Sequence, residues 1–124
     1  MKGIKAYNQI RTREAIHSGE LREIAVLLLD ICYLETSSSH KDWLRVHSSE
    51  GESFYRSSLI DFCEKHFCER SRFIKTNGNL AINLGMIQDI NPVTKKITLK
   101  NDEPIKIKPH SWSDFIKNYS KYFQ

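Results

Sequence analysis

The sequence has 124 residues, which is enough for one compact domain with a hydrophobic core, and its 40% hydrophobic and 27% charged residues exclude a disordered or fibrous chain. The longest apolar run, Ile24 to Leu29, is too short to span a bilayer, and no apolar signal segment follows the charged N-terminus. We therefore expect a single domain over residues 1–124 of a cytoplasmic protein that has no membrane partner.

The formal charge of +4 is unevenly distributed along the chain. Residues 1–69 hold 9 Lys+Arg and 11 Asp+Glu, whereas residues 70–124 hold 10 and 4, so the two parts carry −2 and +6. This split favours a polyanionic partner for the second part, although a basic surface is also common on proteins without one. The odd number of cysteines argues against a disulfide framework.

Turn signals recur about every eight to twelve residues, which indicates a mostly β (α+β) protein built from short hairpins. Alternating apolar residues predict strands at 9–16 and 21–29, as a hairpin around Ser18-Gly19, and at 30–35, 43–47, 53–56, 80–84, 97–99 and 105–107. The predicted turns are 49–52, Asn91-Pro92 and Asn101-Asp102. Ser58 begins a short central helix, about 58–67, and Ser111 begins a C-terminal helix with Trp112, Phe115, Ile116 and Tyr119 on one face.

Metal and catalytic chemistry find little support in the sequence. Cys63, His66 and Cys68 are of the residue types that zinc prefers, but no second pair of ligands follows at finger-like spacing, so we expect core thiols and no metal site. Walker, dinucleotide and metalloprotease motifs are missing, and no cysteine adjoins an oxyanion-hole turn. We expect no catalytic residue, no cofactor and no enzymatic activity.

Two polar loops are the candidate binding segments. Residues 36–42 offer hydroxyls together with His40 and Lys41, which suit phosphates or base edges, but a solvated hairpin loop has the same composition. In Lys75 to Asn79, Asn77 and Asn79 can each donate and accept, as adenine requires, and Gly78 lets the backbone approach a ligand. Asn-Gly-Asn is equally a favoured tight turn.

Taken together in order, five segments give the chain a family resemblance. They are Asp30-Ile-Cys-Tyr-Leu-Glu35, Trp43-Leu-Arg-Val-His47, Phe54-Tyr-Arg-Ser-Ser-Leu59, Phe73-Ile-Lys-Thr-Asn-Gly-Asn-Leu-Ala-Ile-Asn83 and Ile87-Gln-Asp-Ile90. This series resembles the LytTR family of DNA-binding domains, with an I-x-Y-x-E strand, a hairpin, a helix entry and an F-x-R-x-H-R-S-x-x-V-N segment. The resemblance covers residues 24–123 and leaves 1–23 as a less certain N-terminal strand region.

The resemblance implies a fold of short β-hairpins with one central helix and a C-terminal helix, whose loops enter successive major grooves of duplex DNA. Carried over, Lys75 takes the place of a phosphate-contacting arginine, and Asn77, Gly78 and Asn79 take the central contact loop. Lys108 and His110 fall in the last contact loop, and His40 or Lys41 in the first. The implied protein is a bacterial transcription regulator that binds two repeated half-sites as two copies.

Two departures from the family pattern affect these assignments. Gly78 has no side chain where a base-reading residue is expected, and Asn77 replaces an imidazole, so the base preference of the family cannot be inherited. The usual N-terminal receiver domain is also missing from this sequence, which is then either a stand-alone member or a fragment of a longer regulator. The alternative interpretation is therefore a protein-interaction module that pairs with a full-length regulator and has lost or weakened DNA recognition.

Overall fold

The computed structural model describes residues 3–66 and 73–122 of the chain. Its strands are β1 (Gly3–Tyr7), β2 (Glu23–Leu27), β3 (Ile31–Thr36), β4 (Trp43–Ser48), β5 (Gly51–Arg56), β6 (Phe73–Thr76), β7 (Leu80–Asn83), β8 (Ile87–Asn91), β9 (Lys96–Leu99) and β10 (Pro104–Lys106). Its helices are α1 (Arg13–Ser18), α2 (Leu59–Lys65) and α3 (Pro109–Tyr122), with short 3-10 turns at Leu28–Asp30 and Leu84–Met86. The mostly β (α+β) prediction is confirmed.

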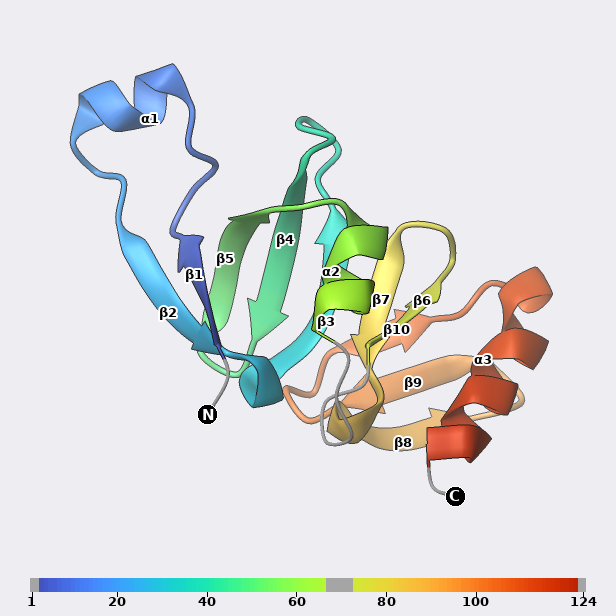
Figure 1. Ribbon diagram of the computed structural model, residues 1–124. Helices are drawn as coiled ribbons and strands as arrows, with labels where there is room; N and C mark the ends of the chain where they lie inside the picture. Colours follow the sequence, from blue (N-terminus) through green and yellow to red (C-terminus); the bar gives the residue numbers. More distant parts are fainter. Residues whose placement is uncertain (1–2, 67–72, 123–124) are drawn as a thin grey trace.

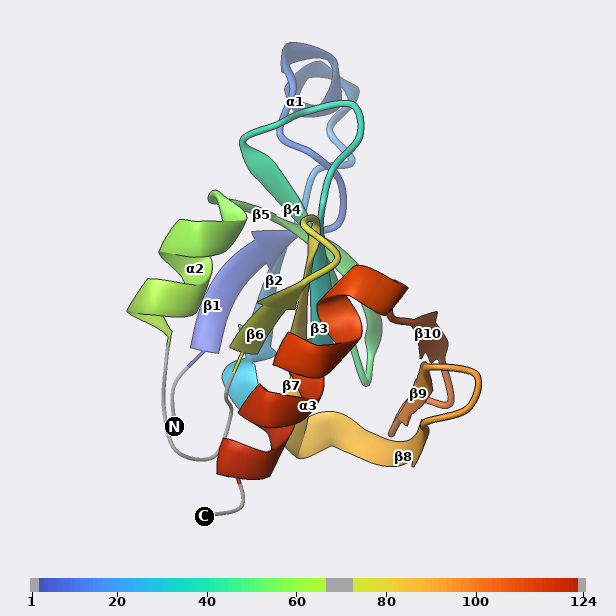
Figure 2. The same ribbon diagram turned by 90° about the vertical axis from the view of Figure 1, so that its right-hand side faces the viewer.

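The strands form two antiparallel sheets. The larger has the order β2-β1-β5-β4-β3-β7-β6, and the smaller has the order β10-β9-β8 (Figure 1). Turning the molecule shows α2 on one side of the large sheet and the small sheet on the other, with α3 running beside β6 (Figure 2). No helix within the described ranges is long and apolar enough to cross a membrane.

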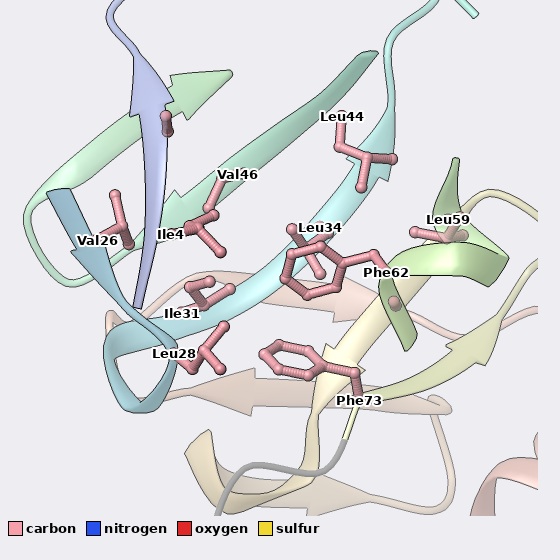
Figure 3. Packing of buried hydrophobic residues seen from close by; sticks show 12 residues of the cluster. Ile4, Val26, Leu28, Ile31, Leu34, Leu44, Val46, Leu59, Phe62 and Phe73 are labelled. Atoms are coloured by element: carbon pink, nitrogen blue, oxygen red, sulfur yellow. The ribbon is translucent and has the colours of Figure 1, made fainter. Parts of the chain in front are cut away.

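Each face of the large sheet covers its own hydrophobic core. The first core lies under α2, where Phe62 is 1% exposed and meets Phe73 edge to face at a ring-centroid distance of 5.3 Å (Figure 3). The second core joins the small sheet and α3, whose Phe115 is fully buried. Strand β3 serves both cores: Ile31 and Leu34 face the first, while Cys32 and Tyr33 face the second. A register irregularity between Ile31 and Tyr33 accompanies this change of side.

The N-terminal hairpin differs from the prediction. Residues 13–18 form a helix instead of a strand, because the Thr12 hydroxyl accepts a hydrogen bond from the Ala15 amide at 3.1 Å and caps it. Gly19 then ends the helix with a left-handed φ of 73°. The strand that pairs with β2 is β1, over the full length from Gly3 to Tyr7. The predicted strand at 9–16 is therefore wrong, and helix α1 lies in the connection between β1 and β2.

The remaining predicted elements are largely confirmed. The Ser58 hydroxyl caps α2 by accepting from the Asp61 amide at 3.2 Å, while residue 67, the predicted helix end, lies outside the described residues. Helix α3 begins at Pro109, two residues earlier than expected, because proline suits the first helical position, where its missing N–H costs nothing. The turn between β4 and β5 is shorter than predicted and consists of Ser49 and Glu50.

Candidate nucleic-acid interface

The register of the large sheet brings two polar loops to the same end of the molecule. Thr36 of β3 pairs with Leu44 of β4, so the loop 37–42 projects from that end. Leu80 of β7 pairs with Glu35 on one side and with Thr76 on the other, which places the loop 77–79 beside it. The loop 37–42, the loop 77–79 and the first turn of α3 follow one another from the top of the molecule downwards in both views (Figures 1 and 2).

The loop 37–42 is held by its own hydrogen bonds. The Ser37 amide donates to the Trp43 carbonyl and the Trp43 amide to the His40 carbonyl, each at 3.0 Å. The buried Ser37 hydroxyl accepts from the His40 amide at 3.3 Å. His40 Nδ1 lies 2.9 Å from the Ser39 hydroxyl, and Nε2 makes no hydrogen bond within the described residues. This frame presents exposed His40 and Lys41 at the loop tip.

The loop 77–79 is tied to the loop 37–42 by its backbone. The Thr36 amide donates to the Asn79 carbonyl at 3.1 Å, across the junction of β3 and β7. Asn77 and Gly78 both adopt left-handed backbone angles, with φ of 56° and 81°. Glycine and asparagine are the residues that adopt these angles at least cost, so the Asn-Gly pair forms the tight turn that its sequence favours. Residues 77–79 therefore form a tight turn and also contact the end of β3.

Asn77 also ties this loop to the third segment. Its Nδ2 donates to the Lys106 carbonyl at 2.9 Å, and its Oδ1 accepts from the Lys108 amide at 2.8 Å. Each end of the carboxamide thus makes one hydrogen bond to the segment that leads into α3, so Asn77 positions that segment and keeps one N–H and one lone pair for a further contact. Asn79 is exposed, and no hydrogen bond of its side chain occurs within the described part of the chain. Asn79 therefore carries the available carboxamide of the loop.

A pocket of about 250 Å³ lies between the loop 77–79 and the first turns of α3. It is lined by Lys75, Thr76, Asn77, Gly78, His110, Ser111, Asp114 and Phe115. Lys75 and His110 are exposed at this pocket, whereas the Thr76 hydroxyl is buried and has no hydrogen-bond partner among the described residues. The exposed groups of Lys75 and His110 suit an anionic oxygen such as that of a phosphate, which would also lie near the Asp114 carboxylate.

All eight residues selected from the sequence lie at this end of the sheet. Seven are exposed, and Asn77 is half-buried: His40, Lys41, Lys75, Asn77, Gly78, Asn79, Lys108 and His110. The opposite end, at the β4–β5 turn, has a pocket of about 260 Å³ whose lining includes Asp30, Glu50 and Glu52. Three lysines and two histidines thus lie at one end of the sheet, called the basic end below, together with Asp42 and Asp114, whereas carboxylates line the pocket at the other end.

The predicted thiols lie apart from this surface. Burial raises the pKa of Cys63 to about 11, so this residue is a neutral thiol at physiological pH. Cys32 is fully buried in the second core. Cys68 lies outside the described residues, within which no cluster of three or more His, Cys, Asp or Glu side chains could hold a metal ion.

Sequence reasoning missed two contacts that join the polar segments. The Thr36 amide joins the two loops through the backbone, which leaves no trace in residue type. The bridge made by Asn77 spans 31 residues, so no local pattern reveals it.

Comparisons with known proteins agree with this geometry. The family model for the LytTr DNA-binding domain matches residues 22–118. Among solved structures, the chain is similar to the LytTr DNA-binding domain of a protein described as a methyl-accepting/DNA response regulator from Bacillus cereus. The TM-score is 0.69 at 21% identity, and the match covers 94% of this chain and 95% of the other. No curated protein matches the chain.

Proposed function

Since the chain belongs to the LytTR family of DNA-binding domains, we propose that it is a transcription regulator that reads a specific duplex sequence through loops placed in successive major grooves. Family membership gives DNA as the partner and transcription regulation as the general role. The proposal adds which residues read bases, which hold the backbone, and how many copies bind.

The observation that carries the proposal is the coupling of three polar segments into one surface. The Thr36 amide links loops 37–42 and 77–79, and the Asn77 carboxamide links loop 77–79 to Lys106 and Lys108. A surface fixed in this way enters a groove without first ordering its loops, so it loses less conformational entropy on binding. Coupled loops also keep a constant spacing, which reading of successive grooves requires.

Roles follow from the chemistry of each exposed side chain. Asn79 is the candidate base reader, since its carboxamide pairs a donor with an acceptor as adenine does in the major groove. His40 is a second candidate, at the tip of the first loop. The ammonium groups of Lys41, Lys75 and Lys108 suit phosphates, because a point charge binds any phosphate regardless of sequence. We place two copies on repeated half-sites and the regulator in the cytoplasm.

The test is selection from a random duplex pool followed by a salt titration of the winning duplex. We expect an enriched motif that repeats, with scrambled duplex of equal composition bound more weakly. With roughly four to six phosphate contacts per domain, the logarithm of the association constant should fall with that of salt with a slope of about −4 to −5. A pool without enrichment and a flat salt response would overturn the proposal, and pairing with a full-length regulator would then be the function to measure.

A further inference from the structure

A second basic pocket lies at the same end of the sheet, on the far side of loop 37–42 from α3. It has a volume of about 340 Å³ and is lined by Tyr7, Arg11, Trp43 and Arg56. Tyr7 ends β1, Arg11 lies in the connection to α1, and Trp43 and Arg56 face each other across β4 and β5. None of these residues was selected from the sequence as part of a binding site.

The pocket is joined directly to the first contact loop. Trp43 closes loop 37–42, because its amide donates to the His40 carbonyl and its carbonyl accepts from Ser37. The indole is 8% exposed and meets the Tyr7 ring edge to face, with centroids 6.1 Å apart. Both views show α1 and loop 37–42 extending from the same end of the molecule (Figures 1 and 2). A ligand in this pocket would therefore lie alongside whatever loop 37–42 contacts.

The two guanidinium groups of the pocket are exposed and uncompensated. Neither Arg11 nor Arg56 forms a salt bridge within residues 3–66 and 73–122. Arg45, on the same strand as Trp43, shows the contrast: it lies 3.4 Å from a Glu35 oxygen and 3.6 Å from a Glu52 oxygen. Two cationic forks beside a rigid aromatic wall suit an anion with several oxygens, since guanidinium groups bind phosphate in a bidentate manner.

We propose that the Arg11 and Arg56 pocket binds the DNA backbone where the duplex continues beyond loop 37–42. This inference rests on the proposed function. It extends the length of duplex that the protein contacts by phosphates that the three loops do not reach. Tyr7 and Arg11 precede residue 22, where the family model begins, so the contact belongs to the N-terminal hairpin of this chain. The pocket is open to solvent at the basic end, which favours a long polyanion that spans both sites over an isolated small anion.

The test compares two double variants that remove the same charge. Arg11→Ala with Arg56→Ala empties the pocket of cations, whereas Lys65→Ala with Lys121→Ala removes exposed lysines from the last turns of α2 and α3. Both lower the formal charge from +4 to +2. Binding of a generic random-sequence duplex is measured by fluorescence anisotropy over a range of salt, and melting temperatures confirm that all proteins fold.

The arginine variant should reduce the steepness of the salt slope by about 2, and should raise Kd about ten-fold at low salt. The lysine variant should retain the wild-type slope. Arg11→Lys with Arg56→Lys should restore most of the slope, since an ammonium still neutralises a phosphate. Equal slopes for the two alanine variants, whether reduced or unchanged, would overturn the proposal that the pocket binds phosphates. A wild-type protein that binds no duplex would instead overturn the proposed function itself.

Discussion

Asn77 accepts a hydrogen bond from the backbone amide of Lys108 at 2.8 Å and so fixes the start of the last contact segment from a turn 31 residues earlier in the chain. The same carboxamide donates to the Lys106 carbonyl. Because the turn backbone also binds Thr36 through Asn79, one three-residue loop sets the relative position of all three polar segments. The structure thus gives Asn77 a positioning role in this surface.

Asn77→Gly tests this bridge. Glycine keeps the left-handed φ of 56° without strain, so the variant loses the two hydrogen bonds of the carboxamide and adds only the greater freedom of glycine in the unfolded chain. We expect a loss of about 1–2 kcal/mol in the free energy of unfolding, since each partly solvated hydrogen bond contributes about 0.5–1.5 kcal/mol. Affinity should fall for selected and scrambled duplexes by the same factor, as measured by urea unfolding and anisotropy.

Asn77→Ala serves as the matched variant, because it adds backbone strain to the same loss and should be the less stable of the two. A glycine variant that binds scrambled duplex as well as wild type, but no longer prefers the selected one, would contradict the bridging role and assign base reading to Asn77.

Asn79→Ala should change sequence preference while leaving the fold intact. Its side chain is exposed, and its only described bond to a neighbour is made by the backbone carbonyl, which alanine retains. Loss of a bidentate base contact should cost about 1–3 kcal/mol of discrimination between selected and scrambled duplexes. Competition anisotropy with the two duplexes measures this difference.

Lys75→Ala is the companion to that experiment, since an ammonium binds any phosphate. It should weaken both duplexes equally and reduce the steepness of the salt slope by about 1. Unchanged discrimination in a folded Asn79→Ala protein would leave His40 and His110 as the residues to test for base reading.

How much of the fold and of the site the sequence predicts depends on how far apart in the chain the interacting residues lie. Strand β3 is predictable because Ile31 to Leu34 are buried on both faces of the sheet, so the strand forms a continuous run of apolar residues. The residues of the basic end are predictable as polar loops between such strands. Helix α1 is missed because a capped helix of six residues carries too few apolar positions to outweigh the hairpin signal of Ser18-Gly19.

Long-range pairing explains what the sequence could not reveal at the interface. The bridging role of Asn77 follows from its contact with Lys106 and Lys108, and that contact exists only once the segment after β10 lies beside the β6–β7 turn. The pocket of Arg11 and Arg56 likewise forms from residues that β1 and β5 bring together. The residue types predict the chemistry of the basic end, whereas the strand order determines which of its side chains are brought together.

Asn83→Ala should destabilise the junction between the two cores. Its side chain is 1% exposed, and it donates to the Ile31 carbonyl at 2.9 Å and accepts from the Gly85 amide at 3.1 Å. Removal takes this partner from the buried Ile31 carbonyl and from the half-buried Gly85 amide, so we expect a loss of about 2–4 kcal/mol in the free energy of unfolding. Asn8→Ala is the matched control, because its two similar hydrogen bonds, to Glu20 and from Arg22, are exposed and should contribute about 1 kcal/mol. Equal losses in urea titrations would refute the role of burial.

Cys63 should make the protein less stable at alkaline pH. Burial raises the pKa of this thiol from an ordinary 9.0 to about 11 in the folded state, so the unfolded chain releases a proton that the folded chain keeps. The resulting stabilisation is complete below pH 9 and is lost as the pH rises from 9 to about 11. Cys63→Ala removes the titrating group, and its unfolding free energy should decline less steeply across that window than that of the wild type. Because burial also raises the pKa of Cys32 and Tyr33, which both proteins retain, only the difference between the two pH profiles reports Cys63. Parallel profiles would show that the thiol ionises equally easily in the folded and unfolded states, and would contradict the packing of Cys63 between α2 and the first core.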